Sequence, residues 1–218
     1  MKKMHKRAMA LCLTAALCSG LFAGCGGEKN TAETQQATEA QAADVQTESS
    51  DIYVEKIDGI SDDFIRGMDA SEVLSLENSG VKYYDYDGNE QDIFKTLADS
   101  GVNYIRLRVW NDPYDKDGNG YGGGNCDLNT AVELGKRATK YGMKVNIDFH
   151  YSDFWADPKR QNCPKAWEGM DLEQKKEALY QFTKDSLNTL LDAGVDVEMV
   201  QIGNEINYGL AGEKLQPN

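Results

Sequence analysis

Four short apolar segments, separated by longer amphipathic ones, constrain the fold of this chain more than any other feature of its sequence. The apolar segments are predicted strands at residues 64–68, 102–109, 143–149 and 195–202. The segments between them are predicted helices, at residues 91–98, 127–141 and 171–193. Glycines follow these helices, and Asp127 and Asp171 are suitable N-caps. Alternating strands and helices with strongly apolar strands are typical of a parallel sheet.

The polar and aromatic residues that could carry chemistry lie at or just beyond the ends of these strands: Asp69, Trp110, His150 and Glu205. A (β/α)8 barrel places its functional residues at that end of its strands. We therefore predict an α/β fold of this class, a (β/α)8 TIM barrel with about the first four βα units present. The alternative is a doubly wound open sheet, which usually has a glycine-rich phosphate-binding turn after a strand, and none is found here.

The expected domains follow from the length that a barrel requires. A complete barrel takes roughly 250 residues. We therefore expect residues 51–218 to be the N-terminal half of a truncated barrel. Residues 25–50 are rich in Gln, Ala, Thr and Glu and lack aromatic side chains. Such a segment buries little apolar surface, so a flexible stalk is predicted, with an isolated helix as the alternative.

Residues 1–24 have the pattern of a secretory signal peptide. Basic residues precede an apolar run that is short for a membrane span. The run ends in Leu-Phe-Ala-Gly before Cys25, which resembles a bacterial lipobox. We therefore expect lipidation of Cys25 and an extracellular protein anchored to the bacterial cell membrane as a lipoprotein. Ordinary signal cleavage is the alternative.

The charge and the cysteines limit the partners. A formal net charge of −13 disfavours nucleic acid and anionic membrane surfaces, so the only membrane contact expected is the lipid anchor. The negative net charge is compatible with a neutral polymer as the partner. Once the signal is removed and Cys25 is lipidated, Cys126 and Cys163 remain. In an oxidising compartment they could form a disulfide, and two unpaired thiols are the alternative.

No metal site is predicted from these residues. No pair of Cys or His residues has the spacing of zinc ligands. The segment Asp115–Gly120 resembles the opening of a calcium loop, but Cys126 stands where that loop requires a Glu. A turn built from Asp, Asn and Gly is the preferred interpretation.

Glu205 is the candidate catalytic carboxyl group. Hydrolysis of a glycosidic bond usually takes two carboxyl groups, of which one donates a proton. Glu205 follows a predicted strand, and the amide of Asn204 beside it could orient a sugar hydroxyl. A strand-end Glu is otherwise a solvated charge, so its neighbours decide its role.

Charged residues on the two preceding strands supply those neighbours. Arg106 and Arg108 alternate with apolar residues and should share one face, as should Asp148 and His150. The arginines could form structural ion pairs, or one of them could keep a nucleophilic carboxylate ionised; which one is open. His150 is equally suited to a structural or a site role.

Aromatic residues follow the third strand. Tyr151, Trp155 and Trp167 lie in the loop beyond it. Aromatic faces stack on the C–H face of a pyranose, so these side chains are candidate sugar platforms. Packing under the loop is the alternative, especially for Trp167.

Four segments in order resemble the arabinogalactan endo-β-1,4-galactanases, glycoside hydrolase family 53. They are Arg66–Ser71, Arg106–Pro113, Asp148–Pro158 and Gln201–Ile206. The resemblance implies a (β/α)8 barrel that cleaves β-1,4-galactan, a neutral pectin side chain, internally and with retention. It implies that Glu205 is the acid/base and that Asn204 contacts the 2-hydroxyl. Arg106, His150, Trp155 and Asp157 match substrate-binding positions.

The resemblance also implies what lies beyond this sequence. The nucleophile of the family is a Glu at the end of the seventh strand. No cofactor is required, although some members hold calcium in later loops. Two alternatives remain: a related glycosidase acting on mannan or β-glucan, and a non-catalytic cell-surface glycan-binding lipoprotein.

Overall fold

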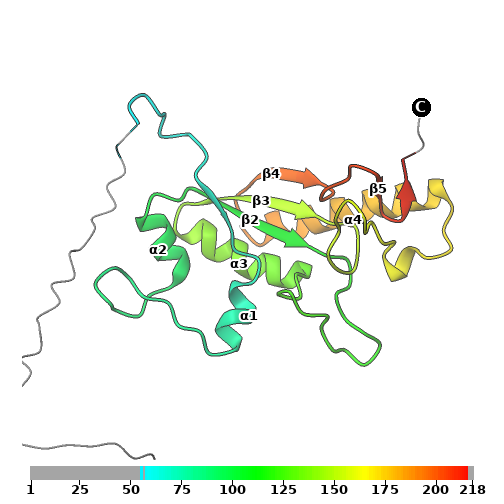
Figure 1. The fold of residues 1–218 in the computed structure, drawn as a ribbon, viewed down its shortest axis with the longest axis horizontal. Helices are drawn as coiled ribbons and strands as arrows, with labels where there is room; N and C mark the ends of the chain where they lie inside the picture. Colours follow the sequence, from blue (N-terminus) through cyan, green and yellow to red (C-terminus); the bar gives the residue numbers. More distant parts are fainter. Residues whose placement is uncertain (1–54, 56, 216–218) are drawn as a thin grey trace, which may run out of the picture. The chain divides into compact units, whose positions relative to one another are not determined.

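A computed structural model describes residue 55 and residues 57–215 (Figure 1). The predicted signal peptide and stalk, including Cys25, lie outside the described residues. Four strands form a parallel sheet in the order β1-β2-β3-β4. They are β1 (Gly67–Asp69), β2 (Tyr104–Val109), β3 (Lys144–Phe149) and β4 (Val197–Ile202). The parallel alternation of strands and helices predicted from the sequence is confirmed.

The helices lie between these strands. They are α1 (Val73–Asn78), α2 (Ile93–Asp99), α3 (Leu128–Lys140), the 3₁₀ helix η1 (Lys165–Trp167) and α4 (Leu172–Asp192). A short antiparallel hairpin, β5 (Gly209–Leu210) and β6 (Glu213–Lys214), follows β4. Helix α1 was not predicted, because it has only six residues and no side-chain cap.

The two long helices begin where their caps predict. The Asp127 side chain accepts a hydrogen bond from the Thr130 amide, and Asp171 and Gln174 form a reciprocal capping box. Each cap satisfies backbone N–H groups that have no partner within the helix. Local sequence therefore fixes the starts of α3 and α4.

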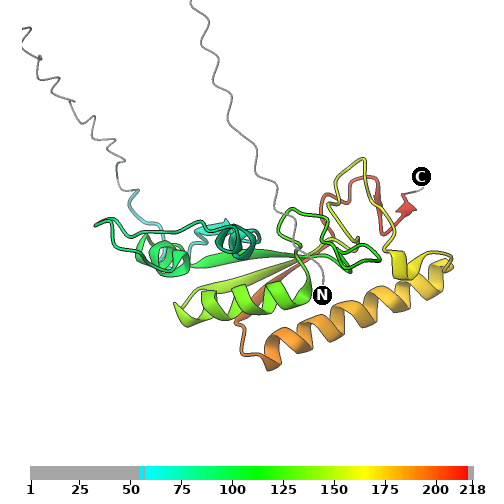
Figure 2. The same ribbon diagram turned by 90° about the horizontal axis from the view of Figure 1, so that it is seen from below.

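The helices cover one face of the sheet. Alternate side chains of β2 and β3 are buried against them: Ile105, Leu107, Val109, Val145, Ile147 and Phe149. Figure 2 shows α3 and α4 side by side on this face. Arg137 of α3 pairs with Glu77 of α1 and with Asp92 before α2, at 2.7 and 2.8 Å. Helices on a single face of a sheet with sequential strand order are the arrangement of a (β/α) barrel.

The first strand differs from its prediction. Residues 64–68 were expected to be extended, whereas β1 spans Gly67–Asp69. Before it, the Asn103 side chain accepts from the Arg66 amide at 2.8 Å and donates to the Phe64 carbonyl at 2.9 Å. Phe64 and Ile65 are exposed. The Asn103 side chain thus takes the place of a neighbouring strand's backbone hydrogen bonds at this position. The apolar residues of this segment do not reveal such a contact.

Within the part of the chain that the structure describes, no helix has the length and apolarity that crossing a membrane requires.

Candidate active site

Arg106 lies at the centre of the polar residues at the carboxyl end of the sheet. Its guanidinium donates to Asp69 of β1 at 2.6 Å and to Asp148 of β3 at 2.5 Å. It also donates to Asn204, just after β4, at 3.0 Å. One side chain therefore joins residues from all four parallel strands or their ends, and we call Arg106, Asp69, Asp148, His150 and Asn204 the arginine network.

His150 extends this network through a main-chain group. Its Nδ1 accepts a hydrogen bond from the Ala156 amide at 3.1 Å. A neutral ring then carries its proton on Nε2. Nε2 lies 2.9 Å from Asp148 Oδ2, an electrostatic contact without the direction of a good hydrogen bond. Both side chains are fully buried, so Asp148 depends on Arg106 to compensate its charge, with the neutral His150 ring beside it.

The Ala156 peptide connects His150 to Asn204. Asn204 Nδ2 donates to the Ala156 carbonyl at 2.7 Å, and its Oδ1 accepts from Arg106. Gln201 Nε2 lies 3.3 Å from the same Oδ1. The side chain of Asn204 is therefore held from both ends, as a group that orients a ligand must be.

Glu205 differs from this network because its side chain is exposed. Its backbone adopts φ +50°, in the left-handed region that non-glycine residues seldom occupy. Gly203, with φ +83°, begins the bend, and a Cβ there would lie 2.4 Å from Ile206 Cγ2. The Gln161 side chain donates to the Asn204 and Glu205 carbonyls at 2.8 and 3.3 Å. The bend turns the Glu205 carboxyl group toward solvent.

Arg108 and Trp155 form part of the wall of a cavity. The Arg108 guanidinium lies 4.1 Å from the centroid of the Trp155 ring and 3.1 Å from Glu72. Together with Asp69 and Arg106 they line a cavity of about 490 Å³. Arg106 and Arg108 share one face, as predicted. Both form ion pairs with carboxylates of the described chain. Structural ion pairs were one of the two roles that the sequence left open for these arginines.

Asp69 is held in its charged form. Burial by itself would raise its pKa, but hydrogen bonds from the Ser71 hydroxyl and amide, and the charges of Arg108 and Arg106, outweigh burial and lower the pKa below 3.8. Ser71 donates to Asp69 from its hydroxyl at 2.7 Å. The negative charge at the end of β1 is therefore stable at neutral pH.

Three candidate residues make structural contacts in the described part of the chain. Asp157 is not in the network: it forms a turn, pairing with Arg160 at 2.6 Å and accepting from two backbone amides. Tyr151 is fully buried and its hydroxyl bonds to Thr183 of α4 at 2.8 Å, so it is not a sugar platform. Trp167 packs against Tyr151 and Phe182, as the packing alternative predicted.

The disulfide that Cys126 and Cys163 could have formed is absent, and both thiols are free. Cys126 is buried beside the Ser71 and Gly123 carbonyls. Burial raises its pKa to about 11, despite the nearby charge of Arg108. Its carbonyl accepts from the Trp110 amide, just after β2, at 2.7 Å, whereas Cys163 lies half-buried in the loop after β3. The alternative of two unpaired thiols is therefore correct.

The segment Asp115–Gly120 is a turn, as preferred. Asp115 Oδ1 accepts from the Asp117 and Asn119 amides at 2.9 and 2.8 Å. Among residues 57–215, no group of His, Cys, Asp and Glu side chains is arranged to hold a metal ion.

Sequence reasoning missed Ser71, Gln161 and Gln201. Ser71 follows Asp69 by two residues, a spacing at which an Asp side chain commonly accepts from the chain. Gln161 lies in a loop 44 residues before Glu205 and had no such signal.

The fold and these contacts define a class of protein, a (β/α) barrel whose polar residues converge at the carboxyl ends of its parallel strands. Comparison with known proteins makes the class specific. The sequence pattern described as "Glycosyl hydrolase family 53" matches residues 65–218. The chain belongs to this family, and its four βα units are those of a (β/α)8 barrel.

Individual relatives agree. The chain is 57% identical to an "Endo-beta-1,4-galactanase" of Bacillus subtilis over 165 residues, which is 76% of this chain and 38% of the relative. It is 41% identical to an "Arabinogalactan endo-beta-1,4-galactanase" of Humicola insolens, over 66% of this chain and 41% of the relative. The chain thus spans about two fifths of the length of these relatives.

A solved structure, the "Ignisphaera aggregans GH53 catalytic domain", superposes with a TM-score of 0.70 at 48% identity. The superposition covers 72% of this chain and 44% of that one. A fungal β-1,4-galactanase structure superposes with a TM-score of 0.61 at 42% identity, over 67% of this chain and 42% of that one.

Proposed function

We propose that the protein is an endo-acting glycoside hydrolase that cleaves β-1,4-galactan with retention, and that Glu205 is its general acid/base. Relatives named as galactanases support the substrate. The observation that carries the role of Glu205 is its contrast with Asn204: the amide is held rigidly by Arg106 and Ala156, while the carboxyl group beside it is exposed.

In the proposed reaction, the nucleophilic carboxylate bonds to the anomeric carbon while Glu205 donates its proton to the departing glycosidic oxygen. The leaving galactan chain departs as an alcohol. Glu205 then accepts a proton from the water that attacks the same carbon and displaces the nucleophilic carboxylate, which regenerates both groups. Asn204 orients the sugar ring through a hydroxyl group.

The nucleophilic carboxylate is expected from the seventh strand, by family resemblance. Asp69 and Asp148 support this assignment, because both already pair with Arg106 and are poorly available to attack carbon. Either arginine could still contact that nucleophile, and Arg106 is the better supported, since it lies beside Asn204. Trp155 is the better supported sugar platform, since it lines a cavity with Arg106 and Arg108.

The test compares the full-length protein with its Glu205→Gln variant on potato galactan, mannan and cellulose. We expect reducing ends to be released from galactan, and the substitution to lower kcat by about 10²- to 10⁴-fold while binding is largely kept. Release from mannan or cellulose alone would favour a related glycosidase. Binding without release would favour a glycan-binding lipoprotein.

We also propose that the protein is secreted and lipid-anchored through Cys25. The basic residues, short apolar run and lipobox-like sequence support this location. In cells fed a labelled fatty acid, the wild-type protein should carry the label and Cys25→Ser should not. An unlabelled wild-type protein would contradict a lipid anchor at Cys25.

A further inference from the structure

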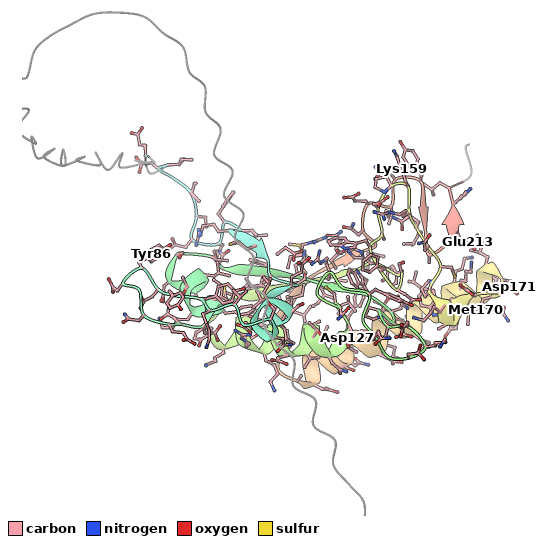
Figure 3. All side chains as sticks on the ribbon, turned by 60° about the horizontal axis from the view of Figure 1, so that its bottom comes forward. Tyr86, Asp127, Lys159, Met170, Asp171 and Glu213 are labelled. Atoms are coloured by element: carbon pink, nitrogen blue, oxygen red, sulfur yellow. The ribbon has the colours of Figure 1, made fainter. Side chains whose placement is uncertain are left out.

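A cavity of about 710 Å³ lies between the loop after β3 and the β5–β6 hairpin. Aromatic and polar side chains line it, among them Tyr121, Phe154, Gln161, Cys163 and Tyr208. Its volume falls in the range of small-molecule sites. We call it the hairpin pocket. Figure 3 shows Lys159 and Glu213, which also line it, at the same end of the described unit.

The hairpin pocket adjoins Glu205 through one side chain. Gln161, part of its wall, donates to the carbonyls of Asn204 and Glu205. Its Oε1 atom is buried and has no hydrogen-bond partner among the described residues. Tyr208, which also lines the pocket, follows Glu205 by three residues. A ligand in the pocket would therefore lie next to the bend that presents Glu205.

The pocket offers an aromatic face suited to a sugar. Tyr208 is 69% exposed, and within residues 57–215 no aromatic or cationic side chain stacks on it. Tyr121, in contrast, has Lys165 Nζ over its ring and the edge of Phe154 against it. The apolar face of a galactosyl ring can stack on Tyr208, while Lys159, Asn162 and Glu213 are placed to bond its hydroxyls.

The pocket is preformed because its hairpin is fixed to the loop. The Gly212 amide donates to the Gln161 carbonyl at 2.7 Å, and a Cβ at Gly212 would lie 2.8 Å from Cys163 Cβ. Lys175 of α4 pairs with Glu213 at 2.5 Å. Such anchoring reduces the entropy lost on binding.

The position of the pocket indicates which part of the substrate it holds. In the proposed function, Asn204 contacts a hydroxyl group of the sugar that forms the covalent bond. The oxygen of its side chain accepts from Arg106, so that sugar is expected beside Arg106. The hairpin pocket shares no lining residue with the cavity at Arg106, and it adjoins the Glu205 backbone through Gln161. An acid faces the group that it protonates. We propose that the hairpin pocket binds the galactosyl units of the leaving group, with Tyr208 as their platform; this inference rests on the proposed function.

The test compares two substrates whose leaving groups differ. β-1,4-Galactotetraose places galactosyl units on the leaving side, whereas 4-nitrophenyl β-1,4-galactobioside places only a nitrophenol there. In the full-length protein, Tyr208→Ala should lower kcat/KM for the tetraose roughly three- to tenfold relative to the nitrophenyl substrate. Tyr208→Phe keeps the aromatic ring, so it should keep most of the wild-type ratio of kcat/KM between the two substrates. Equal losses on both substrates, or none, would overturn the proposal.

Tyr86→Ala is the matched control. Tyr86 is 86% exposed and lies at the opposite end of the described unit (Figure 3). Tyr86→Ala should leave the ratio of kcat/KM between the two substrates unchanged. A change equal to that of Tyr208→Ala would also overturn the proposal.

A binding measurement separates this proposal from the proposed function. Alkylation of Cys163 by iodoacetamide, mapped by peptide mass, should slow when galactotetraose is added, and Tyr208→Ala should abolish that protection. Buried Cys126 serves as the internal reference. Protection without any cleavage of galactan would sink the proposed function and keep the pocket assignment. Cleavage of galactan without protection of Cys163 would keep the proposed function and sink the pocket assignment.

Discussion

Two arginine–aspartate pairs of almost the same length lie near Asn204 and have opposite surroundings. Arg106 and Asp148 are 2.5 Å apart, and Asp148 is fully buried. Arg160 and Asp157 are 2.6 Å apart, yet the arginine is 63% exposed. The first pair joins two strands, whereas the second closes a turn of four residues. Distance alone would rank them equally.

The difference shows that burial and sequence separation decide what an ion pair does. A buried carboxylate must be paired, so Arg106 is required for the strand ends to come together. An exposed pair competes with water and contributes little. This is why Asp157, although it matches a substrate-binding position by resemblance, is not part of the arginine network.

The largest expected effect comes from breaking the buried pair. Arg106→Ala should lower the free energy of unfolding by about 3–5 kcal/mol, because it leaves Asp148 buried with only His150 beside it. Urea unfolding of the full-length protein measures this as a lower midpoint at constant slope. Arg160→Ala is the control and should leave the midpoint unchanged; equal shifts would refute the distinction between the pairs.

Removing the link between His150 and Ala156 should have the next largest effect. His150→Leu leaves the Ala156 amide without its acceptor and should cost about 1–3 kcal/mol. His150→Asn can place an oxygen near the position of Nδ1 and should cost less. Thermal unfolding compares the two variants, and an equal loss in both would mean that packing, not this hydrogen bond, matters.

The pH dependence should separate Asp69 from exposed carboxylates. Its folded-state pKa is lowered, so its contribution to stability is complete above the ordinary value of 3.8 and is lost as pH falls through the lower, folded pKa. Asp69→Asn should therefore make the melting temperature fall less steeply than in the wild type below about pH 4. Parallel curves from pH 2 to 6 would contradict the assignment.

The smallest effect is expected at the exposed pair. Asp157→Asn keeps the shape of the side chain and removes only the charge that Arg160 contacts. Activity of the full-length protein on galactan should change by no more than about twofold. A loss approaching that of Glu205→Gln would restore Asp157 to the site and weaken the contrast drawn above.

Much of the fold could be predicted from the sequence, because the signals were local. Asp127 and Asp171 cap helices through atoms three residues away, and the apolar runs of β2 and β3 identify buried strands. The boundaries of β1 could not be predicted. There the partner is Asn103, 37 residues beyond Arg66, and no local pattern reports such a contact.

The site divides in the same way. Alternation along a strand placed Arg106 with Arg108, and Asp148 with His150, on one face. It could not decide whether the aromatic residues of the following loop were exposed. Tyr151 and Trp155 are four residues apart, yet one is buried under α4 and the other lines a cavity.

The sequence by itself determined the residue types, their faces on the strands and the strand-end position of Glu205, because periodicity and caps act over a few residues. Only the tertiary structure decided which charges are paired, that both cysteines stay free, and that Gln161 supports Glu205. Those outcomes depend on contacts between segments dozens of residues apart. Their strength is set by burial, which exists only once the chain is folded.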